Sequence, residues 1–539
     1  LGAKGYETCL GFSVGTPQGD ALSRYCAGKV VYPDPVFAPE DFQRCMLELS
    51  PQFDFIVPTK EKALLTTAQI KTEIEAKGAT LPIAGYESMQ LATNKVEVLR
   101  RAGTLGLHVP RTVTTSKQPS IDEIEQRVGS PFIMKASTEI GLPPIERHFL
   151  VRAGDTDLFE EKFNALSAYG PVILQEFVRG WGAGVALLYS GSGDLVAFAG
   201  HRRLFEVFSD GGPSVLATTM VHPGALDQAR RLLEGLSWKG IAMVEFRVNT
   251  KDEAVFMEVN PRFWGTLSLA IASGVDFPSL LLESYGARGV GRPIGPTRVR
   301  RYFSFRALAT AVTSPLEKRP DLRPLAVQLP ASIPRLSIKE LQGADPRPEV
   351  EEFFHLLRAR ASKRHISKVG PILLGPAMDY RLLRRTGVRT VVDLREPGEI
   401  ARRPLTLPTG LARTGFPITD DAGIDPTGFR EIAQRIETAT ASGEVYVHCR
   451  QGKGRAPMVV IGYLAWRHLP LEQAFKTVYD ARPHASLTPA QKAAIYLFHR
   501  TLDTSAPSNR PRETRQEPVP DQTAAGLRQH ADLRGELRP

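Results

Sequence analysis

The chain has little cysteine and no long apolar run. Its 539 residues include four cysteines, Cys9, Cys26, Cys45 and Cys449, with no C-x-x-C pair and no zinc-type spacing. So few cysteines argue against a disulfide-rich secreted fold and suit a reducing compartment. No uninterrupted apolar stretch is long enough to cross a bilayer. We therefore expect a cytoplasmic protein with no membrane partner.

Aromatic residues are also sparse, at 8% of the sequence, and they do not alternate with basic residues. This pattern predicts no nucleic-acid partner, although the net charge is +10. An anionic, phosphorylated substrate explains the basic excess equally well. Oligomeric state is left open, and because the chain begins at Leu1 rather than Met, so is a preceding strand or targeting segment.

The length predicts about two to four domains, and a hydrophobic content of 42% predicts that most of them are globular. Residues 1–90 alternate short apolar strands with helical patterns. We expect strands at Thr8–Val14 and Phe53–Pro58, and helices at Asp41–Leu49 and Ala63–Lys77. This is typical of a small α/β domain with a parallel sheet.

From residue 91 to about residue 300 the pattern is richer in strands. The basic run His201–Arg203 is predicted to end a strand, and a Gly-rich loop, Ser209–Ser214, to follow it. The other expected elements are a helix at Asn94–Ala102 and strands at Phe132–Lys135, Val172–Val178, Gly184–Tyr189, Leu195–Gly200, Gly240–Val248 and Ala254–Val259.

Three oxygen-bearing side chains lie on the last two of these strands. They are Glu245, Glu258 and Asn260, and the last two, being two residues apart, share one strand face. Hard Mg²⁺ prefers such carboxylate and amide oxygens. Lys135, at the end of another strand, is placed to meet phosphate oxygens as a point charge.

The segment resembles the ATP-grasp superfamily, nearest to its carbamoyl-phosphate-synthase-like and carboxylate–amine ligase branches. The resemblance depends on Glu245, on the string EVNPR at 258–262, and on HRR followed by GGPS. The resemblance implies Mg²⁺, with Mn²⁺ as a substitute, on the three oxygen ligands, Arg262 facing an acyl phosphate, and His201, Arg202 and Arg203 as candidate substrate contacts. It also implies ATP contacts from Lys95, Lys135, Gln175, Glu176, Phe177 and Val178.

Two departures from that family stand out. The segment after the lysine strand reads ASTEIGLPPIER, with one glycine where many members carry a Gly-rich flap. The strand after the hinge strand, Gln175–Val178, contains RGWGAG and lacks the acidic residue that often holds ribose. Nucleotide binding is predicted more firmly than turnover.

Residues 301–364 are richer in proline and charge and are interpreted as a trailing segment and linker, with a short helix at Glu349–Arg358. Residues 365–503 form a further predicted α/β domain. Residues 504–539 are rich in Pro, Arg, Glu and Gln and are expected to be a disordered tail. The predicted fold class is thus α/β multidomain: a small parallel α/β domain, an ATP-grasp fold and a further α/β domain that contains Cys449.

The chemistry predicted for this last domain depends on one stretch, His448–Arg455. A strand, Val445–Val447, precedes it, and a helix, Met458–Leu469, follows. Loop amides and a helix N-terminus attract phosphate, Arg455 offers a bidentate fork, and their field favours the nucleophilic thiolate of Cys449. The loop between them is Arg450, Gln451, Gly452, Lys453 and Gly454.

The string HCRQGKGR resembles the H-C-x5-R signature of the dual-specificity and protein tyrosine phosphatases, most of all the atypical dual-specificity branch. The resemblance implies that Cys449 forms a phosphocysteine, that Arg455 holds the phosphoryl oxygens, and that His448 tunes the thiolate. By family spacing Asp420 is the best candidate acid, Asp421 the runner-up and Asp425 a distant third.

Ala456 stands where many members carry Ser or Thr, so slow hydrolysis of the phosphoenzyme is expected. The leading hypothesis is a bifunctional enzyme: an ATP- and Mg²⁺-dependent ligase or kinase joined to a phosphatase. Its partners would be a small-molecule carboxylate or a phosphorylated metabolite. One alternative is a phosphatase regulated by a non-catalytic nucleotide-sensing module, and another is a ligase with an inactive phosphatase.

Overall fold

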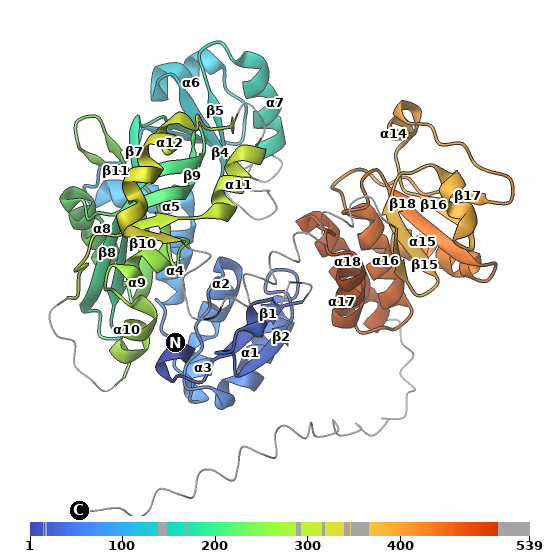
Figure 1. Cartoon of the computed structure of the whole chain (residues 1–539), viewed down its shortest axis with the longest axis horizontal. Coiled ribbons are helices and arrows are strands. Elements are labelled where there is room, and N and C mark those ends of the chain that lie inside the picture. Colours follow the sequence, from blue (N-terminus) through green and yellow to red (C-terminus); the bar gives the residue numbers. More distant parts are fainter. Residues whose placement is uncertain are drawn as a thin grey trace, which may run out of the picture.

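The computed structural model describes residues 1–14, 16, 19–137, 148–167, 170–286, 293–314, 318–338, 345 and 366–504. Within these ranges the strands form sheets of two, four, seven and five strands. Figure 1 shows the elements of residues 366–504 grouped apart from those of the large sheet. The expected helix at Glu349–Arg358, the segment after Lys135 from residue 138 to 147, and the tail beyond Thr504 lie outside the described residues.

The N-terminal unit is a small parallel sheet flanked by helices. Strands β1 (Cys9–Ser13) and β2 (Gly28–Tyr32) pair in parallel, and α1 spans Pro39–Leu49. The strand expected at Phe53–Pro58 is wrong: Phe55 forms only an isolated bridge to Thr80. Two prolines bracket that stretch and remove backbone donors, so the pairing does not extend.

The helix expected at Ala63–Lys77 is two helices, α2 (Glu61–Gln69) and α3 (Lys71–Ala76). They are separated at Ile70, whose φ of −111° and ψ of 24° are not helical. Helices α4 (Tyr86–Thr93) and α5 (Lys95–Thr104) lead out of the N-terminal unit.

The four-stranded sheet is antiparallel and has one face covered by helices. Its order is β3-β6-β4-β5. Phe132, Met134 and Ala136 of β4 are buried against α6 and α7, so Lys135 lies on the opposite face. The elements are β3 (Thr112–Thr115), α6 (Ile121–Val128), β4 (Phe132–Ala136), β5 (His148–Val151), α7 (Thr156–Ser167) and β6 (Val172–Glu176).

The seven-stranded sheet has the order β11-β10-β7-β8-β9-β12-β13. One face packs on α4, α5 and α8, and the other on α9 and α10. Its first strands and helices are β7 (Gly180–Tyr189), β8 (Leu195–Phe208), β9 (Gly211–Thr219), α8 (Pro223–Gly235), β10 (Gly240–Asn249), β11 (Ala254–Asn260), α9 (Leu267–Ala272) and α10 (Phe277–Ser284).

Two sequence-based expectations about this sheet are wrong. His201–Arg203 lie inside the long strand β8 and do not end it. Most of Ser209–Ser214 belongs to β9, with only a tight turn before Gly211. Because β8 pairs along most of its length with β9, the glycines of this segment lie in a strand.

The described residues between 301 and 338 add two strands to the same sheet. Strand β12 (Arg301–Phe303) pairs with β9, and β13 (Leu336–Ile338) pairs with β12. Helices α11 (Phe305–Thr313) and α12 (Arg323–Ser332) lie between them. This part of the segment interpreted as a linker therefore completes the seven-stranded sheet.

Residues 366–504 form the five-stranded sheet, in the order β14-β15-β18-β16-β17, with its last four strands parallel. A short 3₁₀ helix, Tyr380–Arg385, lies between β15 and β16. The elements are β14 (Ser367–Val369), β15 (Ile372–Pro376), β16 (Val388–Asp393), α14 (Pro397–Arg402), β17 (Ala412–Gly415), α15 (Pro426–Thr440), β18 (Glu444–Cys449), α16 (Arg455–Trp466), α17 (Leu471–Ala481) and α18 (Pro489–Thr504).

Candidate active sites

The loop from Cys449 to Arg455 joins the central strand β18 to the N-terminus of α16. Cys449 is 3% exposed, and the Gly452 amide donates a hydrogen bond to its Sγ at 3.2 Å. Gly452 has φ of +69°, and a Cβ there would lie 2.5 Å from the carbonyl carbon of Gly375. Only glycine lets the loop turn tightly enough to aim its amide at the thiol.

Arg455 is held from two sides before any ligand binds. Its two terminal nitrogens donate to the Glu399 carboxylate at 2.6 and 2.9 Å, and Nη1 also donates to the Ile418 carbonyl at 2.9 Å. The Arg455 hydrogen bonds lower the pKa of Glu399 to about 2. The buried Nε of Arg455 has no hydrogen-bond partner among the described residues. That orphaned donor suits a bound oxyanion.

His448 is fully buried behind the loop and contacts neighbouring side chains. Its Nε2 lies 2.8 Å from the Tyr380 hydroxyl and 3.6 Å from Asp393. Burial is the main cause that lowers the pKa of His448 to about 4, so the ring is neutral at pH 7. Arg395 and Arg413 hold Asp393 in turn, at 2.8 Å each. These contacts hold the His448 ring in place at the end of the strand that carries Cys449.

The candidate acids differ in their surroundings. Asp420 Oδ1 lies 3.1 Å from Arg455 Nη2, at the phosphate side of the loop. Asp421 has φ of +62°, and burial, followed by the charge of Asp420, raises its pKa. Asp425 caps α15 by accepting from the Gly428 amide at 2.7 Å, so the structure does not place it with the other two.

The remaining loop side chains form an open rim. Arg450 is about half exposed, 3.8 Å from Asp420 and 3.9 Å from Glu399. Gln451 is exposed, and Lys453 is half-buried. Arg450 and Lys453 therefore give the opening of the site above the buried Cys449 a positive charge.

The second site lies on the β10–β11 hairpin. Glu245 and Glu258 stand directly opposite each other, and Asn260 donates to Glu245 at 3.1 Å. Arg262 Nη2 donates to the side-chain amide oxygen of Asn260, Oδ1, at 3.2 Å. Arg203 Nη2 lies 2.5 Å from the Glu245 carboxylate. The structure thus brings the three predicted oxygen ligands together, with the guanidinium group of Arg203 beside them.

Burial and charge act differently on the two carboxyl groups. Burial raises the pKa of Glu245 despite the charge of Arg203. Burial acts in the same direction on Glu258, but the positive charges of Lys95, Lys135 and other residues outweigh it and lower its pKa. Lys95 Nζ lies 3.6 Å from Glu258. The described residues contain no cluster of three or more His, Cys, Asp or Glu, so the donor set here is two carboxylates and an amide.

The predicted hinge divides between two sides of its strand. Gln175 accepts from Lys135 Nζ at 2.9 Å, on the face away from α6 and α7. Glu176 points the other way and accepts from Arg111 Nε at 3.0 Å. Phe177 and Val178 line a cavity of about 340 Å³ together with Glu176. Gln175 is therefore next to Lys135, and Glu176 is not.

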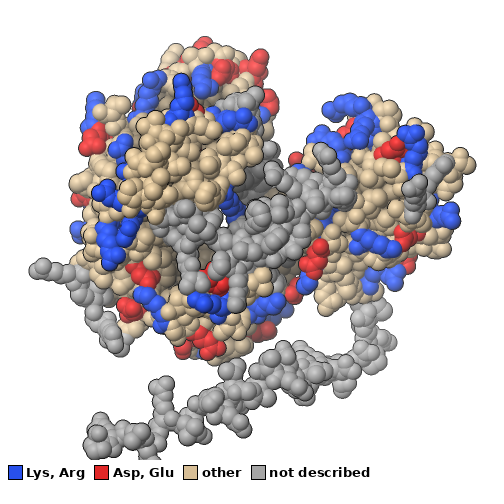
Figure 2. Space-filling model, in the orientation of Figure 1, with Lys and Arg blue, Asp and Glu red and all other residues tan. Residues whose placement is uncertain are grey.

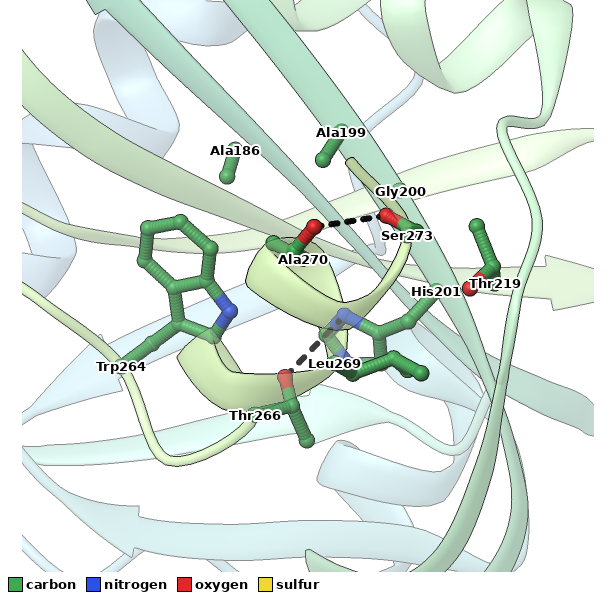
Figure 3. A pocket seen from close by; sticks show the side chains of 10 residues that line it. All are labelled: Ala186, Ala199, Gly200, His201, Thr219, Trp264, Thr266, Leu269, Ala270 and Ser273. Carbon is green, nitrogen blue, oxygen red and sulfur yellow. Dashed lines mark hydrogen bonds between the residues drawn. The ribbon is translucent and has the colours of Figure 1, made fainter. Parts of the chain in front are cut away.

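His201 and Arg203 lie on one face of β8 and Arg202 on the other. His201 is buried, its Nδ1 lies 3.4 Å from the Thr266 hydroxyl, and burial lowers its pKa to about 3. Figure 3 shows His201 and Trp264 lining a cavity of about 10 Å³, too small for more than a water. The Arg202 guanidinium stacks over Trp181 at 4.6 Å.

Two charged residues next to these sites were not predicted from the sequence. Glu399, which holds Arg455, lies 56 residues before it, and no motif links the two. Glu206 joins Arg203 at 3.4 Å to Arg247 at 2.9 Å. Glu206 was missed because the strand was expected to end before it, whereas β8 continues to Phe208.

Comparison with protein families divides the chain at these two sites. Residues 374–468 match a model described as "Polymorphic toxin system, DSP-PTPase phosphatase". Residues 170–304 match one described as "ATP-grasp in the biosynthetic pathway with Ter operon". The chain combines an ATP-grasp domain with a dual-specificity phosphatase domain. Both resemblances, and the α/β multidomain fold class, are thereby confirmed.

The curated relatives of the chain are named as phosphatases. The chain is 32% identical over 146 residues to the phosphatidylglycerophosphate phosphatase PTPMT1 of Arabidopsis thaliana, covering 25% of this chain and 43% of the relative. It is 33% identical over 66 residues to the mouse phosphatidylglycerophosphatase and protein-tyrosine phosphatase 1, covering 12% and 34%. The chain thus spans less than half the length of each.

Similar solved structures include the biotin carboxylase domain of Hydrogenobacter thermophilus 2-oxoglutarate carboxylase with MgADP, at 14% identity and a TM-score of 0.45, covering 56% of this chain and 69% of that one. Another is the Staphylococcus aureus N5-carboxyaminoimidazole synthetase with ADP, also at 14% and 0.45, covering 56% and 76%. No described helix is both long and apolar enough to span a membrane.

Proposed function

We propose that this chain is a bifunctional enzyme. One half is an ATP- and Mg²⁺-dependent ligase or kinase that acts through an acyl-phosphate or phosphoryl intermediate. The other is a cysteine-dependent phosphatase for a phosphorylated small molecule or protein. The observation that carries the proposal is the buried Cys449 facing a loop amide, with Arg455 already held in place by Glu399.

In the phosphatase reaction the Cys449 thiolate attacks phosphorus. The S–P bond forms as the P–O bond to the leaving group breaks, and an aspartic acid gives its proton to the leaving oxygen. Arg455 and the loop amides hold the phosphoryl oxygens. Water then attacks the phosphocysteine, the carboxylate accepts the water's proton, and phosphate leaves with Cys449 restored. Ala456 offers no hydroxyl to the departing sulfur, so this second step is slow.

Two neighbouring carboxyl groups compete for the role of the acid. Asp420 lies beside Arg455, while the raised pKa of Asp421 favours its protonated form. Asp420→Asn and Asp421→Asn, assayed on an alkyl phosphate, separate them. The acid's variant should lose about 10²-fold or more in kcat and the basic limb of the pH profile, and the other variant should keep both.

Basic residues at the mouth of the site favour a multiply charged phosphate ester. Arg450 is exposed beside the loop, and Figure 2 shows Lys and Arg side chains gathered near α14, the helix that carries Glu399. The curated relatives are named for a phosphatidylglycerophosphate substrate, which is also a phosphomonoester. A substrate panel tests this: higher kcat/KM on a phosphotyrosine peptide than on every small polyphosphate would reject it.

For the ATP-grasp half, the donor set fits Mg²⁺, since Glu245, Glu258 and Asn260 present hard oxygen ligands from adjacent strands. Bound there, the metal would act as a Lewis acid on ATP phosphates. Lys135 and Lys95 would hold phosphate oxygens, Gln175 to Val178 would contact adenine, and Arg262 would face the acyl phosphate. His201 would support the substrate pocket.

The alternative is that this half only senses nucleotide and regulates the phosphatase. The single glycine in the segment after Lys135 motivates it. Mg²⁺-dependent ADP release by the Cys449→Ser protein, with a carboxylate or hydroxyl acceptor, would reject it. A ligase with an inactive phosphatase predicts instead that Cys449→Ser changes no activity. The same variant, used to trap a bound metabolite for mass spectrometry, would identify the phosphatase substrate.

A further inference from the structure

The N-terminal unit packs directly against the last helix of the phosphatase domain. The Phe37 and Tyr496 rings stack with centroids 6.0 Å apart and planes at 20°. Arg500 donates to the Phe37 carbonyl at 3.2 Å, and Lys492 lies 3.7 Å from the buried Asp34. Because Lys492, Tyr496 and Arg500 are spaced by four, they form one stripe along α18.

This docking surface is continuous with the phosphatase core. Val14 and Ala38 of the N-terminal unit, 7% and 3% exposed, belong to the same buried cluster as Val447 and Phe475. Phe475 in turn packs against Tyr496, with ring centroids 6.0 Å apart. The N-terminal unit therefore supplies part of the interior of a domain that begins more than three hundred residues later.

The connection between α17 and α18 holds both catalytic loops by hydrogen bonds to their backbone carbonyls. Arg482 Nε donates to Gly452 at 2.6 Å, and the Ser486 amide donates to Lys453 at 2.8 Å. The Thr488 hydroxyl donates to Asp421 at 2.7 Å. Two of these bonds brace the phosphate loop, and the third braces the loop of the candidate acids.

The N-terminal part of α18 also packs tightly against glycines of both loops. A Cβ built on Gly423 would lie 2.6 Å from the Ala494 Cβ and 2.7 Å from the Ala490 carbonyl oxygen. One built on Gly454 would lie 2.7 Å from Gln491 Oε1. A displacement of α18 must therefore move the acid loop and the phosphate loop, because close-packed groups transmit it.

We infer that the N-terminal unit is a positioning surface for phosphatase catalysis, which acts through α18 on the loop of Asp420 and Asp421. This inference rests on the proposed phosphatase function. One side of α18 faces Asp34 and Phe37, and its first turn faces the acid loop. A displacement of α18 at the N-terminal unit would therefore also displace the loop of Asp420 and Asp421, because the helix is closely packed at both places. The ATP-grasp half of the chain thereby sets how well the phosphatase protonates its leaving group.

The test exploits the fact that a proton donor matters for poor leaving groups and little for good ones. In the full-length chain, Phe37→Ala combined with Arg500→Ala should lower kcat about tenfold on an alkyl phosphate. On p-nitrophenyl phosphate, kcat should change less than about threefold, because nitrophenolate leaves without an acid. KM should be unchanged on both, since Cys449 and Arg455 are untouched.

Matched variants separate positioning from loss of stability. Arg44→Ala, which removes an exposed ion pair with Asp41 on α1, should leave both rates unchanged. Phe37→Leu, which keeps apolar contact with Tyr496, should restore most of the alkyl phosphate rate. In the background of the acid variant, the interface changes should cost nothing further on the alkyl phosphate, because both act on one step.

Equal losses on both substrates, or losses that add to those of the acid variant, would overturn the inference and leave the proposed phosphatase intact. A parent protein with no Cys449-dependent turnover of any phosphomonoester would instead reject the proposed function, and the inference with it. Circular dichroism melting of each variant shows whether the protein assayed is folded.

Discussion

The two candidate phosphate sites of this chain each hold an arginine in an ion pair, but the carboxylate partners have different predicted roles. In the phosphatase site, Cys449 and Arg455 are buried, and Glu399 holds Arg455 in a bidentate pair. In the ATP-grasp site, the charged groups are paired with one another, as in Arg203 with Glu245. Glu399 is not a predicted ligand, so its pair with Arg455 can persist when phosphate binds. Glu245 is a predicted metal ligand, so its pair with Arg203 would be exchanged for ligand contacts.

The difference has an energetic consequence. An ion pair that is replaced by a ligand subtracts its own strength from the binding free energy. Arg203 would have to leave Glu245, or share it, when a divalent cation binds. We therefore expect nucleotide and metal to bind the second site together, since phosphate oxygens offer Arg203 a new partner.

The largest effect that separates the two sites is expected for Cys449→Ser. Loss of the thiolate nucleophile should reduce phosphatase kcat by about 10⁴-fold or more. Mg²⁺-dependent ADP formation should be unchanged, since the substitution touches only the phosphate loop. Phosphate release and ADP release are measured on the same preparation, with Cys45→Ser on α1 as the matched control. Loss of both activities would contradict the separation of the sites.

Next in size is Glu258→Gln. An amide keeps the shape of the side chain but removes a negative charge from the oxygen donor set, so ADP formation should fall by about 10³-fold. The phosphatase rate is expected to stay within twofold of the parent, within the usual spread for surface changes. Glu253→Gln, at the turn of the same hairpin, is the control. A metal dependence that survives Glu258→Gln would show that the cation binds elsewhere.

A smaller loss, about 10²-fold in phosphatase kcat/KM, is expected for Glu399→Gln, because Arg455 loses a charged bidentate partner. The pKa of Glu399 is lowered to about 2 from its usual value near 4.5, chiefly by the Arg455 hydrogen bonds. A lowered pKa contributes stability above pH 4.5 that is lost as the pH falls toward 2. The variant lacks this titrating carboxyl group. Its free energy of unfolding should therefore fall less than that of the parent as the pH is lowered from 4.5 toward 2.

Glu431→Gln, on the exposed side of α15, serves as the control for Glu399→Gln. It should change neither the kcat/KM nor the acid unfolding curve. An Arg455 that works equally well without its carboxylate would mean that the Ile418 carbonyl is enough to hold it, and that the site is less dependent on preorganisation than we argue.

The smallest effect is on stability alone. A Cβ on Gly184 would lie 2.3 Å from Cε1 of the buried His201, so Gly184→Ala should destabilise the seven-stranded sheet by about 1–3 kcal/mol. Gly265→Ala, which meets nothing within 4 Å, should cost much less. Urea unfolding followed by Trp fluorescence measures both. In dilute urea, both variants should keep a phosphatase rate close to that of the parent.

The phosphatase loop was predictable because its chemistry lies in consecutive residues between a strand and a helix. The hairpin ligands were also predictable as a cluster, since neighbouring strands bring Glu245 and Glu258 into register. Glu399 and Glu206 were not, because their contacts depend on tertiary packing that leaves no local pattern. The roles of all these side chains, the domain boundaries and a cytoplasmic location stay predictions.

The fold was less predictable where pairing overrides local composition. The glycines at 211 and 212 suggested a loop, yet β8 and β9 pair through them. Phe53–Pro58 suggested a strand, yet only one residue finds a partner. Proline-rich residues beyond 300 suggested a trailing segment and linker, and β12 and β13 of that stretch pair with the sheet. In each case a neighbouring strand, present or absent, decided the outcome.

The contact between Phe37 and Arg500 spans 463 positions of the chain. At ordinary rates of synthesis, roughly 5–20 residues per second, about 25–90 seconds pass between the emergence of one partner and the other. During that time the apolar surface around Phe37 has no phosphatase domain to cover it. The chain therefore carries an exposed hydrophobic patch for most of its own translation, and this interval is when a chaperone would have the most to protect.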